Sequence, residues 1–197
     1  ITIDHTSDDF IVKEGLWKNR RLFELYEEAS TPWEWHQKLY SHAKKIGISI
    51  FSTPFDFSAV DLLEELDSQA YKIASPEIVD LPLIERVCDT GKPLIISTGA
   101  SSIQEISEAI SVIKRKGVSQ VMLLHCTAAY PAPLNEANLS TMKFLSEKFD
   151  VDVGLSDHTL GTIAATTAVS LGASLIEKHF TLSRNDGGID SAFSLEP

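Results

Sequence analysis

The sequence is poor in the features that mark several large classes of protein. Only two of its 197 residues are cysteines, Cys88 and Cys126, and without metal-type spacing we expect both to be reduced and buried. No apolar run approaches the ~20 residues that a membrane span needs, and no basic-then-apolar signal pattern opens the chain. A formal charge of −11 also argues against the clustered Lys and Arg that nucleic acid requires. The sequence therefore predicts a cytoplasmic protein that binds neither nucleic acid nor membrane.

One unit, an apolar strand followed by a polar turn and an amphipathic helix, recurs along the chain. Apolar runs of this kind are typical of parallel strands covered by helices. A capping box is predicted at Ser102 and Glu105, and an N-cap at Asp80. A loop-like stretch over residues 1–30 is expected to precede a helix at residues 33–46, and a further helix is expected at residues 138–149. The six predicted strands are residues 48–53, 70–75, 93–98, 121–127, 151–156 and 174–180.

Two parallel architectures fit this pattern, an open doubly wound sheet and a closed barrel. The glycine-rich first turn of a dinucleotide-binding open sheet is absent. All six predicted strands end in hydroxyl or ionisable residues, and the strand ends of a barrel converge on one mouth. We therefore expect an α/β protein of the (β/α)8 TIM-barrel type. Residues 1–197 would be a partial catalytic barrel with strands 3–8, about six of the eight units, and without the first two strands.

His158 and His179 end the last two predicted strands, which would be neighbours around a barrel. Two imidazoles with open positions between them suit Mn²⁺ or a similar divalent ion. A pair of hydrogen-bonded structural histidines is the alternative, and the sequence leaves it open.

Lys72 stands inside an otherwise apolar strand. A buried ammonium is costly, so it should meet an anion or have a lowered pKa, as a phosphate ligand or a Schiff-base nucleophile. A lysine that extends outward to solvent remains possible. Lys178 alternates with His179, so we expect it to point outward to solvent. Glu77 is placed to act as a general base, and a solvated loop carboxylate is the alternative. The ring of hydroxyls near Lys72 comprises Thr53, Ser75, Ser97 and Ser156, although serine at a strand end is also an ordinary turn residue.

Six motifs resemble the barrel of the sialic acid synthase family and occur in the family's order. They are STPFD at 52–56, YKIASPE at 71–77, ISTG at 96–99, HCTAAYP at 125–131, GLSDHT at 154–159 and EKHFT at 177–181. Two further motifs are similar to the pseudaminic acid synthase branch, TPWEWH at 31–36 and DSAFSLEP at 190–197. The resemblance covers nearly the whole chain from residue 48 onward.

The resemblance implies a metal-dependent transferase that condenses phosphoenolpyruvate with an N-acetylated amino sugar. Phosphoenolpyruvate C3 would attack the open-chain aldehyde, water would add to the resulting cation, and phosphate would leave. For the pseudaminic branch the acceptor would be a 6-deoxy-2,4-diacetamido hexose. The implied metal ligands are His158 and His179, for Mn²⁺ or else Mg²⁺. The implied phosphoenolpyruvate ligands are Thr53, Lys72, Ser75, Ser97 and Ser156, the sugar ligands Tyr130 and Asp190, and the proton-transfer residue Glu77.

The family pattern also extends beyond these residues. Its members carry a C-terminal antifreeze-like domain, which we expect to be absent here and which covers the partner's site in a domain-swapped homodimer. Many carry Asn at the position of Ala128, where it contacts phosphoenolpyruvate, and this chain lacks that contact. Three alternatives remain: an N-acetylneuraminate or legionaminate synthase, a Schiff-base aldolase using Lys72, and a noncatalytic sugar-binding barrel.

Overall fold

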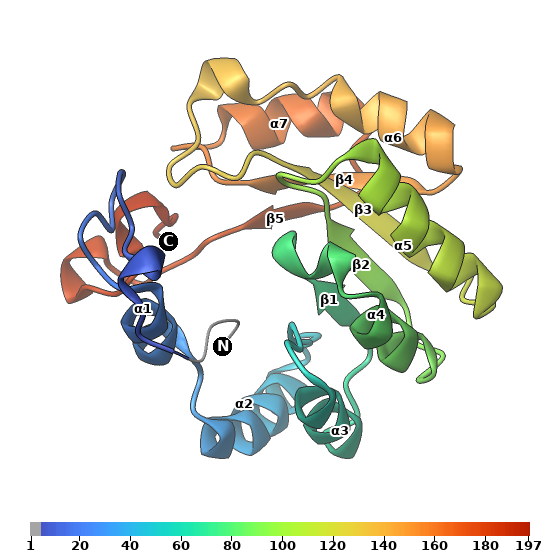
Figure 1. The fold of residues 1–197 in the computed structure, drawn as a ribbon, viewed down its shortest axis with the longest axis horizontal. Coiled ribbons are helices and arrows are strands. Elements are labelled where there is room, and N and C mark those ends of the chain that lie inside the picture. The colour runs from blue at the N-terminus through green and yellow to red at the C-terminus, as the bar shows by residue number, and fades with distance from the viewer. Residues whose placement is uncertain (1–4) are drawn as a thin grey trace.

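The structure, a computed structural model, describes residues 5–197 and is built around one curved parallel sheet (Figure 1). Its strands pair in chain order, each parallel to the next. Helices connect them, and the sheet closes about half of a barrel. The strands are β1 (Tyr71–Ile73), β2 (Leu94–Ser97), β3 (Val121–Cys126), β4 (Asp152–Asp157) and β5 (Ile176–Lys178).

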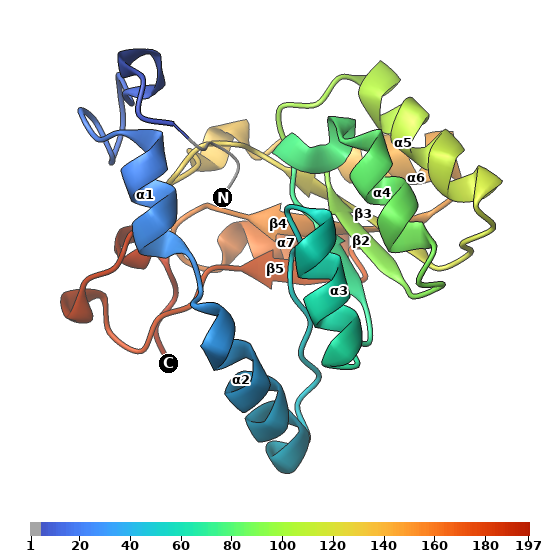
Figure 2. The same cartoon turned by 60° about the horizontal axis from the view of Figure 1, so that its bottom comes forward.

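Helices surround the sheet on its outer, convex side (Figure 1). Four of them, α4 to α7, lie along the strands, and α1 to α3 continue the ring below and to the left. Figure 2 shows the C-terminal segment beside α1. The N-terminal and C-terminal parts of the described chain therefore lie on the same side of the ring. The helices are α1 (Leu22–Ala29), α2 (Trp33–Ile46), α3 (Phe57–Glu65), α4 (Leu81–Cys88), α5 (Ile103–Arg115), α6 (Thr141–Phe149) and α7 (Ile163–Ser170).

Local sequence signals explain where the helices begin. Ser102 Oγ accepts from the Glu105 amide at the start of α5, and the Glu105 carboxylate accepts from the Ser102 amide, so the predicted capping box is confirmed. Asp80 caps α4 by accepting from the Leu83 amide. Gly47 ends α2 with a φ of 74°, a conformation that glycine adopts without a Cβ penalty.

The core lies between the sheet and its outer helices. Tyr71, Ile73 and Leu94 face it from the strands, and Ile110 and Ile113 face it from α5, all almost fully buried. Burying such side chains contributes about 1.5–3 kcal/mol each relative to full exposure. This core fixes the strands whose carboxyl ends carry the polar residues.

Two predicted segments differ from the structure. The expected strand at 48–53 is wrong: the segment makes one isolated parallel bridge, Ser52 with Tyr71, and Ile48 at its start is 62% exposed. An apolar run becomes a strand only where a neighbouring strand supplies a ladder of hydrogen bonds. The expected loop at 1–30 is also wrong where α1 forms, and residues 1–4 lie outside the described residues. Among the described helices, none is long and apolar enough to cross a membrane.

Candidate active site

Lys72 is the buried cation of the site. It is 6% exposed in β1, and its Nζ lies 3.5 Å from Glu177 Oε1 on β5 and donates to the Ile73 carbonyl at 3.3 Å. Burial lowers the pKa of the Lys72 ammonium, and the Glu177 carboxylate partly opposes that shift. The outward, solvent-exposed alternative for Lys72 is therefore wrong.

Glu177 links this lysine to the predicted hydroxyl ring. The register of β4 and β5 places Ser156 opposite Glu177, and Ser156 Oγ donates to Glu177 Oε1 at 2.7 Å. Sequence reasoning assigned Glu177 no role. The signal was available, because Glu177 precedes His179 by two residues and so projects from the same face of the strand.

Two buried polar atoms lack a hydrogen-bond partner within residues 5–197 and belong to predicted site residues. They are Ser97 Oγ at the end of β2 and Glu77 Oε2 beyond β1. Burial raises the pKa of the Glu77 carboxyl above its ordinary value. Ser75 Oγ accepts from the Gly99 amide at 2.9 Å, and its side chain also interacts with the Cys126 thiol. Buried polar groups are nearly always paired in proteins, so a ligand that reaches these atoms could supply the missing partners.

His158 and His179 lie side by side, with ring centroids 5.3 Å apart. His158 Nδ1 donates to the Thr127 carbonyl at 3.0 Å, and His179 Nδ1 lies 3.2 Å from Asp190 Oδ2. A carbonyl or carboxylate on Nδ1 leaves Nε2 as the nitrogen with the free lone pair, the arrangement of metal-ligating histidines. Burial lowers the pKa of the His158 imidazole, which favours the neutral form that binds metals.

These two histidines fit a divalent ion with open coordination positions. Among the described residues, no group of three or more His, Cys, Asp or Glu side chains is placed to hold a metal ion, so these two imidazoles are the protein ligands that the site offers. Two imidazoles alone would leave the other coordination positions of such an ion to substrate oxygens or water.

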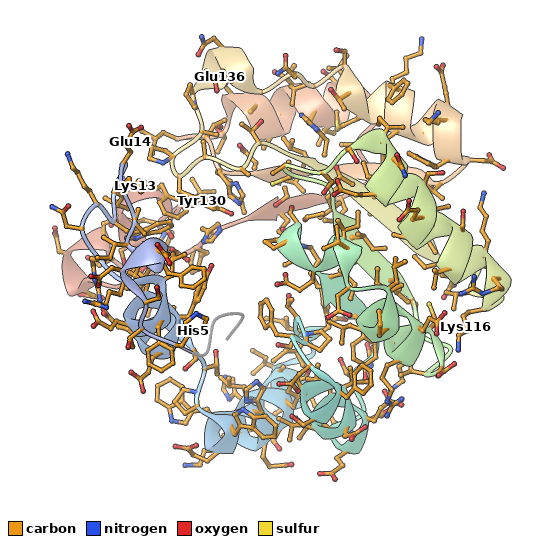
Figure 3. All side chains as sticks on the ribbon, viewed as in Figure 1. His5, Lys13, Glu14, Lys116, Tyr130 and Glu136 are labelled. Carbon is orange, nitrogen blue, oxygen red and sulfur yellow. The ribbon has the colours of Figure 1, made fainter. Side chains whose placement is uncertain are left out.

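Tyr130 covers the histidine pair from the loop after β3. Its ring lies 4.3 Å from the His158 ring and 6.2 Å from the His179 ring. Figure 3 places this side chain at the inner edge of the ring of helices and strands. Burial raises the pKa of Tyr130 to about 12, so its hydroxyl remains a proton donor at neutral pH.

A cavity of about 730 Å³ opens beside these residues, within the size range of small-molecule sites. Five predicted site residues line it: Thr53, Glu77, Tyr130, His179 and Asp190. Glu77 from beyond β1 and His179 from beyond β5 therefore border the same cavity. The other five lie at the strand ends and outside the lining of the cavity: Lys72, Ser75, Ser97, Ser156 and His158.

Lys178 differs from its predicted environment. Its Nζ lies 2.8 Å from Asp157 Oδ2 and donates to the Thr159 carbonyl at 2.6 Å, and its side chain is only 9% exposed. The expected solvent exposure is therefore wrong. Alternation along a strand predicts the direction of a side chain but not which residues cover that face of the sheet. Here the strand register places Asp157 of β4 beside Lys178.

The sequence predicted no role at the site for two further residues that the structure places there. Cys126, predicted only to be reduced and buried, is both, and its Sγ lies 3.9 Å from His158 Nδ1. Burial raises the pKa of this thiol, which keeps it protonated and unreactive. Trp17, from the expected N-terminal loop, lines the cavity and packs against Tyr130 with centroids 5.5 Å apart.

The chain is similar to curated synthases along its whole length. It is 46% identical to a pseudaminic acid synthase of Helicobacter pylori over 196 residues, which are 100% of this chain and 58% of that protein. It is 48% identical to an N,N'-diacetyllegionaminic acid synthase of Campylobacter jejuni over 164 residues, 82% of this chain and 49% of that protein. The chain therefore spans less than two thirds of the curated relatives it matches.

Solved structures show the same architecture. An N-acetylneuraminic acid synthetase from Leptospira borgpetersenii, in complex with citrate, superposes with a TM-score of 0.84 at 37% identity, covering 88% of this chain and 61% of that one. A 3-deoxy-D-arabino-heptulosonate 7-phosphate synthase from Thermotoga maritima, at 14% identity and a TM-score of 0.72, covers 85% of this chain and 67% of that one and shows the fold alone. The family match extends over residues 1–197, and the chain belongs to the NeuB family.

Proposed function

We propose that the protein is a pseudaminic acid synthase, which condenses phosphoenolpyruvate with a 6-deoxy-2,4-diacetamido hexose and releases phosphate. The observation that carries this proposal is the buried Lys72 at the same strand ends as Ser97 Oγ, a buried polar atom without a partner among residues 5–197. Such an arrangement suits an anion that enters and supplies the missing partners. Membership of the NeuB family and 46% identity to the Helicobacter pylori enzyme support the choice of reaction.

The phosphoenolpyruvate site is proposed at the ends of β1, β2 and β4. The Lys72 ammonium would pair with a phosphate or carboxylate oxygen, and the hydroxyls would donate to the others. Hydrogen bonds to charged groups contribute roughly 1.5–3 kcal/mol each, enough for several together to hold a dianion on a chain of net charge −11. The proposed hydroxyl donors are Thr53, Ser75, Ser97 and Ser156.

The divalent ion, with Mn²⁺ the first choice and Mg²⁺ the second, is proposed on His158 and His179. When bound, it would supply Lewis-acid polarisation of the sugar carbonyl. Thr127 and Asp190 hold the two rings through Nδ1, so that both Nε2 atoms remain available.

The acceptor sugar is proposed in the cavity, with its aldehyde near the histidine pair. Tyr130 and Asp190 line that end and would orient its hydroxyl and amide groups. Phosphoenolpyruvate C3 attacks the aldehyde carbon, water adds to the cationic C2, and the C2–O bond then breaks to release phosphate. Glu77 Oε2 would exchange a proton with the reacting oxygens, because its carboxyl is buried, has a raised pKa and lacks a hydrogen-bond partner within the described residues.

The half-barrel sheet is proposed to be part of a complete (β/α)8 barrel in a domain-swapped homodimer. The support for the barrel is the uninterrupted parallel order β1 to β5, together with the similarity to larger solved synthases. In such an enzyme the active form is the intact protein, so each assay below uses it.

A legionaminate synthase is the second candidate, because the Campylobacter jejuni enzyme of that kind is 48% identical over 164 residues. The same strand ends would perform the same reaction on a different acceptor. A Schiff-base aldolase has less support, since Lys72 Nζ contacts Glu177 and Ile73 rather than the open cavity.

The test measures phosphate release by the intact protein with phosphoenolpyruvate, Mn²⁺ and each candidate sugar, with and without chelator. Release that requires the 6-deoxy-2,4-diacetamido sugar of the pseudaminic pathway and stops with chelator is the expected result. Release with the legionaminate precursor or N-acetylmannosamine instead would retain the mechanism and overturn the choice of sugar. Trapping of a Lys72 adduct by borohydride would overturn the mechanism.

A further inference from the structure

The segment around Trp17 forms a short loop that the proposed mechanism leaves without a role. Ile11 and Arg21 close the loop by an antiparallel bridge, and Val12 exchanges backbone hydrogen bonds with Asn19 and Arg20 at 2.8 and 2.9 Å. Trp17 is near its tip and is partly buried, while Leu16 beside it is 48% exposed. The loop therefore holds one large aromatic side chain inward, against the rest of the molecule.

A specific contact fixes this tryptophan beside the site. Its indole Nε1 donates to the Ile189 carbonyl at 3.0 Å, across 172 residues of sequence. The next residue, Asp190, contacts His179 Nδ1. In Figure 1 the N-terminal loop lies over the C-terminal segment, in agreement with this contact. The residue that Trp17 contacts, Ile189, is thus the sequence neighbour of Asp190, whose carboxylate orients a proposed metal ligand.

Trp17 is also part of a continuous aromatic wall. Its ring lies 5.5 Å from Tyr130 and 6.4 Å from Phe193, and Phe193 in turn lies 4.9 Å from the His179 ring. Phe193 is 2% exposed, so it belongs to this wall as a buried packing partner of the other rings. Trp17 and Tyr130 line the cavity itself, so a ligand near the histidine pair meets an aromatic face on one side.

An aromatic face of this kind binds the apolar parts of a sugar. A 6-deoxy hexose presents a methyl group at C6, and each acetamido substituent adds another methyl group. Burying such groups against an aromatic ring is favourable, whereas a hydroxymethyl group brings a polar oxygen that the ring cannot satisfy. Hydrophobic pockets discriminate substrates that differ by one such group by roughly 10- to 100-fold.

We propose that Trp17 is a specificity-determining residue, whose indole face packs against the methyl-bearing side of the acceptor sugar. The proposal rests on the proposed function and names the acceptor class that the site favours, 6-deoxy amino sugars over their 6-hydroxy counterparts. In this proposal the indole ring contacts the sugar, and the indole N–H holds the ring in position through its hydrogen bond to Ile189.

The test compares Trp17→Ala and Trp17→Phe in the intact protein, with Trp35→Phe as the matched control. Trp35 is 54% exposed on α2 and does not line the cavity. Phosphate release gives kcat and KM for the 6-deoxy sugar, for the same sugar with a hydroxyl at C6, and for phosphoenolpyruvate. We expect Trp17→Ala to lose roughly tenfold or more of the preference for the 6-deoxy sugar, with the KM for phosphoenolpyruvate unchanged. Trp17→Phe keeps most of the preference, and Trp35→Phe keeps all of it.

Two results would overturn the proposal while the proposed function stands. An unchanged sugar preference in Trp17→Ala would show that the ring does not contact the acceptor. Equal losses in Trp17→Phe and Trp17→Ala would place the effect in the hydrogen bond to Ile189, and hence in the position of Asp190, rather than in the aromatic face. An unsubstituted protein that releases phosphate with neither sugar would remove the proposed function and this inference together.

Discussion

Replacement of Lys72 by methionine separates the binding role of this residue from any contribution to stability. Lys72 is 6% exposed, so its ammonium has lost most of its hydration, while its partner Glu177 is 38% exposed and gives only a screened attraction at 3.5 Å. Methionine has a similar volume and needs no hydration. We therefore expect Lys72→Met to leave the free energy of unfolding unchanged or to raise it by up to about 2 kcal/mol.

The same substitution should weaken the binding of phosphoenolpyruvate, although it does not destabilise the fold. Removing the cation leaves a substrate anion without its partner in a poorly hydrated site, which costs about 2–5 kcal/mol. At about 1.4 kcal/mol per factor of ten, kcat/KM for phosphoenolpyruvate should fall by roughly 30- to 3,000-fold. Glu177 retains the hydrogen bond from Ser156 at 2.7 Å, so the strand ends stay in place.

The assay combines denaturant unfolding with steady-state kinetics on the same preparation. Lys143→Met serves as the control, because the Lys143 side chain is 78% exposed and pairs with Glu147 along α6. A Lys72→Met variant that unfolds more easily but keeps the KM for phosphoenolpyruvate would refute the reasoning. Lys72 would then be a structural cation, and the anion would bind elsewhere.

Three further substitutions test other parts of the structure. Burial raises the pKa of the Glu77 carboxyl above 4.5, so the folded chain holds a proton that the unfolded chain has lost, and stability falls as pH rises above about 4.5. Glu77→Gln should therefore raise the free energy of unfolding at pH 7 but not at pH 4, and equal effects at both pH values would contradict this. Lys178→Met, which leaves the 1% exposed Asp157 carboxylate without its cation and with the Thr159 amide still donating to Oδ1, should cost about 3–5 kcal/mol in denaturant unfolding, with partial recovery in the double variant Asp157→Asn/Lys178→Met. Gly154→Ala would bring a Cβ against the Leu175 carbonyl oxygen, so thermal unfolding should reveal a loss of about 1–3 kcal/mol, and an unchanged midpoint would show that β4 and β5 can separate.

Local patterns in the sequence predict the parts of the fold that local physics determines. The strands β1 to β5 coincide with five of the six predicted apolar runs, although β5 is much shorter than the run at 174–180, and the starts of α4 and α5 follow from Asp80 and Ser102. The adjacency of His158 and His179 follows from strand order alone, because consecutive parallel strands place their carboxyl ends at the same edge.

Long-range partners explain what could not be predicted. The environment of Lys178 depends on Asp157 across the strand pair, and alternation along one strand cannot reveal it. The strand expected at 48–53 fails because it has only one bridge to its neighbour, a tertiary property. The place of Trp17 depends on a contact with Ile189, 172 residues away, for which the sequence gives no local signal.

Carbon–carbon bond formation tests the central claim most directly. The intact protein is incubated with Mn²⁺, the 6-deoxy-2,4-diacetamido sugar and phosphoenolpyruvate labelled with ¹³C at C3, and the products are followed by NMR and mass spectrometry. The account predicts that the labelled carbon becomes bonded to the former aldehyde carbon of the sugar, with one phosphate released per product molecule. Label found only in pyruvate, or only in unchanged phosphoenolpyruvate, would contradict it.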